Sequence, residues 1–335
     1  MNAKGTQPPL QPSSLLNLRE VNRYFWSVNR PMTIFFWSVI VTSVLGTIGL
    51  ALDARTVLGL STWAKTTKFS LSMALYAGSM LWFFGYDTLR PRLSRFILSA
   101  SAYLLGIEIV LIMVQGARAV PMHFNFATIL DAVLYQLMAG TIVIFWFVNA
   151  LGVAVLAAQK VPSRAFAWSL RLGLIIALLG MLEGYLMTSP TPDQMALLRA
   201  GQHTDMIGAH TVGAPDGGPG LPFLGWSTTH GDLRIGHFVG LHGLQIIPLL
   251  GVFLMLRRDS WLTEEHKLWL VVIGAAGYLG LTLLVTWQAL RGQPLVAPDG
   301  LTIAVFVAIV TATVTAASAV VWQARGKVNE AAVAT

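Results

Sequence analysis

Long, continuous apolar runs constrain this chain more than any other feature of its sequence. Several of them exceed the roughly 20 residues that a helix needs to cross a ~30 Å hydrocarbon core. Because lipid offers no hydrogen bonds, only helices or closed barrels satisfy the backbone there, and runs without alternation favour helices. Charged residues make up only 11% of the 335 residues, well below the share in a typical soluble domain. The sequence therefore predicts an all-α, polytopic membrane protein.

The apolar runs predict eight transmembrane helices. The predicted spans are 32–53, 66–86, 95–117, 127–158, 165–188, 236–257, 268–290 and 300–323. The one long connection, 189–235, is rich in Gly and Pro and contains aromatic residues. Because disordered segments are usually charged and poor in aromatic residues, we expect an ordered cover. Within it, Thr191 as cap and Pro192 at the first helical position predict a short helix over 192–200.

The distribution of Lys and Arg predicts the orientation in the membrane. With the N-terminus inside, 15 of the 22 basic residues fall in cytoplasmic connections and 7 on the other side, as the positive-inside rule requires. The predicted organisation is a cytoplasmic N-terminal tail (1–31), a first four-helix half (32–158), a second half (159–323) and a cytoplasmic C-terminal tail (324–335). We expect a multi-pass protein of the bacterial inner (cytoplasmic) membrane.

Composition excludes several classes of chemistry. The chain has no cysteine, so disulfides, Cys-ligated zinc, iron–sulfur clusters and thiol nucleophiles are absent. Any metal would need His and carboxylate ligands. The net charge of +7 is typical of cytoplasmic anchoring residues beside membrane lipids, and it does not indicate a nucleic-acid surface.

Two motifs recur in the same order and predict an internal repeat. The pattern Q-x-x-R-x-x-P ends the third span from Gln115 and the seventh span from Gln288. A basic motif precedes the second span at Lys65 (K-x-x-K-F) and the sixth span at Arg234 (R-x-x-H-F). Four spans in each half would make the repeats parallel, with an axis along the membrane normal. Both sets of motifs would then face one outer vestibule.

Polar side chains within the first half are candidate site residues, because an ionisable group at membrane depth is expensive unless it is paired. Glu108 lies near the middle of the third span and indicates a proton relay or a ligand carboxylate; the alternative is a structural ion pair, for instance with Lys68. His123, in the following turn, is a candidate ligand or proton-transfer group, or else a solvated loop histidine. Asp131, in the fourth span, is a candidate proton-coupling group.

The densest polar cluster lies at the start of the sixth span. His237 is near the helix start, and His242 is about 7–8 Å deeper and about 140° around the helix. The two rings therefore cannot share one metal as an i, i+4 pair would. An isolated histidine on an apolar helix is usually a satisfied core group, but the neighbouring polar residues favour a functional site: His230, Asp232, Arg234 and Gln245.

Basic residues gather near the outer membrane boundary, where long cationic side chains often reach toward lipid headgroups. The alternative is an anion site that holds a carboxylate, a phosphate or a haem propionate. The candidate residues for such substrate binding, including two glutamines of the repeated motif, are Lys65, Lys68, Gln115, Arg118, Arg234, Gln288 and Arg291.

Two resemblances accompany these residues. The run H-T-V-G-A-P-D-G-G-P-G-L-P from His210, followed by G-D-L-R-x-x-H-F-x-G-L-H from Gly231, resembles a signature of uncharacterised bacterial multi-pass membrane proteins, a family without an established activity. The architecture, two four-helix halves with outer histidines, is similar to haem A synthase, which pairs histidines across helices in each half. Here the first half has only His123, and the eighth span has no histidine.

Three functions stay open from the sequence. The favoured one is a membrane-embedded oxidoreductase or electron-transfer protein with a His-ligated haem, such as haem b, or a metal near the outer face, and a quinol as partner. His237 and His242 would each ligate the haem or metal together with a different second ligand. His123 and His230 are candidates for that second ligand, and Glu108 would be a proton relay. The others are a proton-coupled transporter of a small organic anion and a membrane assembly factor.

Overall fold

The computed structural model describes residues 17–87, 89–159, 161 and 163–333, with side chains up to residue 326. The predicted features at 1–16, Lys160 and 334–335 lie outside the described residues. The described residues form ten helices: α1 (Leu18–Val28), α2 (Arg30–Leu52), α3 (Ala64–Phe84), α4 (Pro91–Arg118), α5 (Ile129–Ala157), α6 (Arg164–Thr188), α7 (Pro192–Arg199), α8 (Arg234–Leu256), α9 (Glu264–Leu290) and α10 (Gly300–Val333). Two antiparallel hairpins pair β1 (Thr56–Val57) with β2 (Leu60–Ser61), and β3 (Thr211–Val212) with β4 (Gly231–Asp232).

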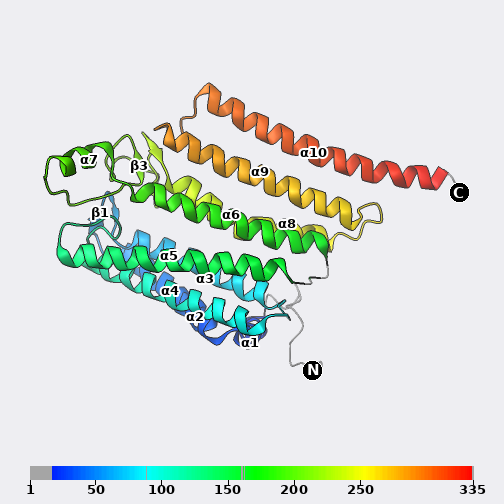
Figure 1. Ribbon diagram of the computed structural model, residues 1–335, viewed down its shortest axis with the longest axis horizontal. Coiled ribbons are helices and arrows are strands. Elements are labelled where there is room, and N and C mark those ends of the chain that lie inside the picture. Colours follow the sequence, from blue (N-terminus) through cyan, green and yellow to red (C-terminus); the bar gives the residue numbers. More distant parts are fainter. Residues whose placement is uncertain (1–16, 88, 160, 162, 334–335) are drawn as a thin grey trace.

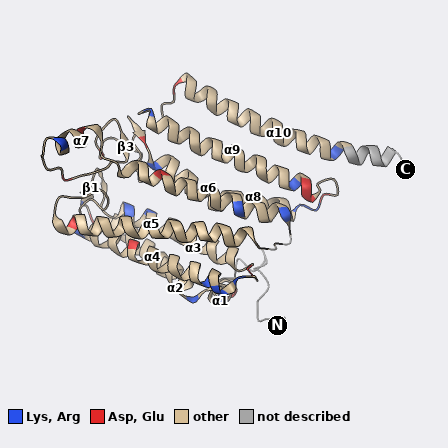
Figure 2. Ribbon diagram, viewed as in Figure 1, with Lys and Arg blue, Asp and Glu red and all other residues tan. Residues whose placement is uncertain are grey.

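The long helices run side by side as an elongated bundle. Helix α7 and strands β1 and β3 lie at one end of it, and α1 and the last turns of α10 lie at the other (Figure 1). Charged residues gather toward the two ends, and the helix middles are almost free of them (Figure 2). The all-α prediction is confirmed, and among the described residues seven helices are long and apolar enough to span a membrane. Helix α3 runs with the others but is not among those seven.

The predicted helix boundaries agree closely with the observed ones. Helix α7 begins at Pro192, where the Thr191 side chain accepts from the backbone N–H of Gln194 and completes a capping box, so the short helix in the long loop is confirmed. Two segments differ from the prediction. Part of the predicted N-terminal tail forms α1, which buries Tyr24 and Phe25, and α10 continues beyond residue 323 to Val333.

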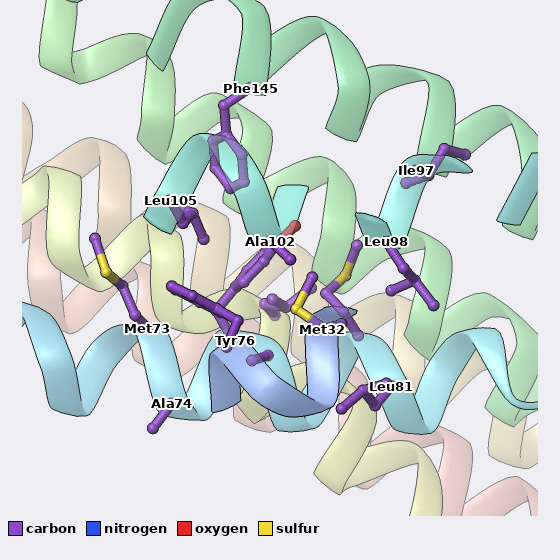
Figure 3. Packing of buried hydrophobic residues seen from close by; sticks show 14 of the residues in the cluster. Met32, Met73, Ala74, Tyr76, Leu81, Ile97, Leu98, Ala102, Leu105 and Phe145 are labelled. Atoms are coloured by element: carbon purple, nitrogen blue, oxygen red, sulfur yellow. The ribbon is translucent and has the colours of Figure 1, made fainter. Parts of the chain in front are cut away.

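The two sets of four long helices pack in the same pairwise pattern. Helix α2 packs against α3 and α4, α3 against α4, and α4 against α5; α6 packs against α8 and α9, α8 against α9, and α9 against α10. The largest apolar core lies mainly in the first set, where Met32, Tyr76, Leu98 and Phe145 come together from four helices (Figure 3), and it continues into α6 and α8. Helix α10 lies at the edge of the bundle beside α9 (Figure 1).

Glycines set the close contact between α6 and α8. A Cβ atom on Gly180 would lie 2.6 Å from the backbone carbonyl carbon of Gly240, and one on Gly173 would lie 2.8 Å from the carbonyl oxygen of Gly243. No real side chain fits at such distances, so the two backbones are in contact, as small residues in membrane helices permit. This contact fixes the height of α8, and therefore of its histidines, relative to α6.

The two Q-x-x-R-x-x-P motifs end α4 and α9 in the same way. The Gln115 and Gln288 amides each donate to the carbonyl of the proline six residues later, at 3.5 and 2.8 Å. In each motif the residue after the arginine is left-handed, Ala119 with φ 53° and Gly292 with φ 71°. The shared motif thus corresponds to a shared helix ending.

Candidate functional site

A cavity of about 1200 Å³ lies between the first and second sets of helices. One end of the cavity, which we call its outer end, is covered by the β1–β2 hairpin and by the long loop, including Gly217 and Trp226. Its inner end reaches the middle of the bundle, at Tyr76, Phe145 and Gln245. The long loop therefore covers a cavity that the two basic motifs reach through Lys65 and Arg234, whereas the Gln and Arg side chains of the two Q-x-x-R-x-x-P motifs do not line it.

The first half contributes a line of three ionisable groups to the cavity. The Lys65 ammonium donates to Nδ1 of His123, and Nε2 of His123 lies 3.5 Å from Oε1 of Glu108. Burial, followed by the nearby Lys65 charge, holds the pKa of His123 well below its ordinary value, so its ring is neutral at physiological pH. Glu108 is buried in α4, and its Oε2 has no hydrogen-bond partner among the described residues.

The long loop contributes a histidine–aspartate pair that the sequence analysis did not identify. Nδ1 of His210 and Oδ2 of Asp216 are 2.5 Å apart, and the Asp216 carboxylate also accepts the backbone N–H groups of His210 and Thr211. Burial lowers the pKa of His210 despite the opposing carboxylate. Burial alone would raise the pKa of Asp216, but these hydrogen bonds hold it below its ordinary value. The sequence feature that could have predicted this pair is an aspartate six residues after a histidine, with Gly and Pro between them.

The second half contributes His237 from the first turns of α8. Its Nδ1 lies 2.7 Å from the carbonyl oxygen of Gly180 in α6. A carbonyl oxygen can only accept, so Nδ1 carries the proton and Nε2 of the neutral ring keeps its lone pair. The ring lines the cavity beside Gly184, where a Cβ atom would approach it to 3.6 Å.

His242 also lines the cavity, one and a half turns deeper on α8. Its Nδ1 contacts Oε1 of Gln245 at 3.2 Å, and the Gln245 amide donates to the Ser79 hydroxyl of α3 at 3.1 Å. The fourth candidate, His230, lies at the outer end of the cavity, and its Nδ1 contacts the hydroxyl of the adjacent Thr229 at 3.0 Å. All of the predicted cofactor-binding histidines therefore lie on one cavity.

The predicted basic ring consists largely of ion pairs. The arginines each pair with a carboxylate: Arg118 with Asp131 at 2.6 Å, Arg234 with Asp232 at 2.6 Å, and Arg291 with Asp299 at 2.5 Å. Gln115 donates to Asp131 as well, and neither glutamine of the repeated motif lines the cavity. Lys68 does line it, but its ammonium donates to the Leu224 carbonyl of the covering loop at 2.8 Å.

The arrangement suits some ligands better than others. No group of three or more His, Asp or Glu side chains among the described residues is placed to hold a metal ion, so a site of several protein ligands for a bare ion has no support. A haem needs only one or two axial ligands. A large, mainly apolar cavity with a few fixed polar groups is typical of sites for organic cofactors and ligands.

Comparisons with known proteins do not identify the chain. It matches no protein-family model, no curated protein and no solved structure.

Proposed function

We propose that this protein is a membrane-embedded electron-transfer protein or oxidoreductase that binds haem in the cavity between its two halves. The observation that carries the proposal is the hydrogen bond from His237 Nδ1 to the Gly180 carbonyl. Histidines that bind metals commonly donate their other ring N–H to a carbonyl or carboxylate, which fixes the tautomer and the ring orientation. His237 would hold the haem through Nε2.

The cavity fits a haem in size and character. Its volume of about 1200 Å³ exceeds the ~300–1,000 Å³ of ordinary small-molecule pockets. His210, held by Asp216, is a second ring with a free Nε2 lone pair on the same cavity. Lys65 and Lys68 both line the cavity without a carboxylate partner at salt-bridge distance among the described residues, and such cations suit propionates. Bound haem would supply one-electron chemistry.

The line from Lys65 through His123 to Glu108 would serve as the proton relay of this site. A neutral imidazole between an ammonium and a carboxyl group can accept a proton on one nitrogen and release one from the other. Glu108 Oε2, buried and unpartnered within the described residues, is placed to exchange that proton. The relay begins in the outer cavity and ends inside the bundle.

Transport of a small organic anion is the weaker alternative. Such a transporter needs cations that are free to engage the substrate. The carboxylates already neutralise Arg118, Arg234 and Arg291, so only Lys65 and Lys68 of the predicted basic ring are left to engage an anion. The described residues thus favour a fixed ligand over a transported one.

The membrane topology is part of the proposal. Helix α3 would be the eighth span, because it runs with the seven apolar helices and its polar residues Lys65, Lys68 and Ser72 line the cavity. The two sets of four helices would be parallel repeats, supported by their shared packing and the shared endings at Gln115 and Gln288. Both termini would be cytoplasmic. The architectural likeness to haem A synthase also supports two four-helix halves.

A reporter fusion tests this topology. Alkaline phosphatase inserted at Gly217, in the loop over the cavity, is expected to be active, because the charge asymmetry places this loop outside the cytoplasm. The same reporter after Arg257, between α8 and α9, is expected to be inactive. Activity with a cytoplasm-only reporter at Gly217 would reverse the orientation.

An absorption spectrum tests the proposed function. Protein purified from haem-replete cells is expected to show a Soret band, with reduced-state α and β bands and near-stoichiometric haem in a pyridine haemochrome assay. A protein without a Soret band, even after incubation with haemin in detergent, would contradict the proposal.

A further inference from the structure

The inner part of the cavity opens sideways, between α3 and α8. Leu71 and Leu75 of α3 and Ile246 of α8 line the cavity, and yet these residues are 46%, 53% and 47% exposed. Residues in the middle of membrane helices that are exposed face lipid. The wall of the cavity is therefore also the lipid-facing surface here, and we call this opening the α3–α8 portal.

A polar group stands at the portal at membrane depth. His242 and Gln245 of α8 form a chain of contacts with Ser79 of α3, at 3.2 and 3.1 Å. The Gln245 oxygen can only accept, so Nδ1 of His242 donates to it and the distal Nε2 of the neutral ring is left as a free acceptor. The Ser79 hydroxyl donates to the Leu75 carbonyl at 2.8 Å, and one amide proton of Gln245 is left as a free donor. His242 and Gln245 both line the cavity and are only half-buried. Polar atoms that face hydrocarbon lose hydrogen bonds to water, so a ligand that supplies hydrogen bonds is favoured there.

The absence of charged residues near the portal on α3 and α8 favours a neutral ligand. Neither α3 beyond Lys68 nor α8 beyond Arg234 contains Lys, Arg, Asp or Glu. At 1.5 Å per residue, Lys68 is about 16 Å along its helix from Ser79, and Arg234 is about 12 Å from His242. An anionic head such as a fatty acid or phospholipid would find no partner at this depth. A neutral ring with hydroxyl or carbonyl oxygens would find His242 and Gln245.

We propose that the α3–α8 portal binds a lipid-soluble quinone or quinol, with its ring oxygens against His242 and Gln245 and its tail in the bilayer. This inference rests on the proposed function, because the quinol would be the membrane partner of the haem site. The route is lateral, so the ligand need not pass the covering loop. The portal and the outer histidines would then be two binding sites in one cavity.

Photolabelling tests the portal with a matched pair of variants. Purified protein in nanodiscs is labelled with a tritiated azidoquinone, and the labelled peptides are identified by mass spectrometry. Label is expected in α3 and α8 around Leu75 and Ile246. Ile246→Trp, which fills the portal, is expected to lower labelling about tenfold. Leu249→Trp, on the same helix and 59% exposed but not on the cavity, is expected to leave it unchanged.

The polar contact is tested by quinone affinity. Gln245→Leu removes the amide but keeps the bulk, and is expected to weaken binding of a short-chain quinone about tenfold, the effect of about one hydrogen bond. Label spread evenly over lipid-facing helices, equal effects of the two Trp variants, or stronger labelling by a photoreactive fatty acid would each overturn the proposal. Haem content is measured in every sample: quinone binding without haem would reject the proposed function alone, and haem without quinone binding would reject the portal alone.

Discussion

His237→Gln is expected to reduce the haem content of the purified protein at least about tenfold, because an imidazole that binds a metal contributes several kcal/mol that an amide cannot replace. Glutamine keeps a polar side chain that can still donate to the Gly180 carbonyl, so helix packing between α6 and α8 should survive. The measurement is the ratio of haem to protein by pyridine haemochrome, with the elution profile as the check on folding.

His203→Gln is the matched control for this experiment. His203 lies in the long loop that precedes α8, with a side chain that is 70% exposed and near Asp205 at the surface. Its replacement is expected to leave haem content unchanged. If His237→Gln retained all of its haem, His237 would not be the haem ligand, and only the other histidines on the cavity could hold the haem. If both variants lost haem equally, the loss would reflect instability.

The helical architecture was predictable because it depends on local properties of the sequence. Hydrophobic runs give the spans directly, and the ends of α5 and α8 fall within two residues of the prediction. Thr191 and Pro192 start α7 as their capping chemistry requires. Helix α1 was treated as a tail because its apolar residues, such as Tyr24 and Phe25, are too few for a span, and only packing against α2 and α3 buries them.

The histidines of the site were predictable from the sequence, but the contacts between its charged and polar side chains were not. The cluster of polar residues at the start of α8 marked His237 and His242, which both lie on the cavity. The contacts of Lys65 with His123, and of Arg118 with Asp131, join residues from different helices and loops. No periodicity within one helix reveals them. Isolated charges at a membrane boundary therefore look like an anion site, although their partners are already present elsewhere in the chain.

Asp232→Ala is expected to destabilise the protein by about 3–5 kcal/mol, the usual cost of removing one partner from a buried ion pair. The Asp232 side chain is fully buried. It accepts from Nε and a terminal nitrogen of Arg234, at 2.9 and 2.6 Å, and from the backbone N–H of Ser227 at 2.8 Å. Removing the carboxylate leaves a largely buried guanidinium without its counter-charge and a buried N–H without an acceptor. Thermal unfolding in detergent measures the change.

Asp53→Ala is the control, because the chain repeats the same local pair in a more open setting. Asp53 accepts from Nε and a terminal nitrogen of Arg55, at 3.0 and 2.7 Å, in the same D-x-R arrangement. There the arginine side chain is 53% exposed and the aspartate 21%, so water can replace the lost contact and the midpoint should fall much less. Asp232→Asn, which keeps the shape but not the charge, is expected to lie between the two. Equal midpoints for Asp232→Ala and Asp53→Ala would mean that the loop over the cavity is not anchored by its buried carboxylate. The covered cavity would then need another support, since Arg234 also holds the loop through the Gly225 carbonyl at 2.5 Å.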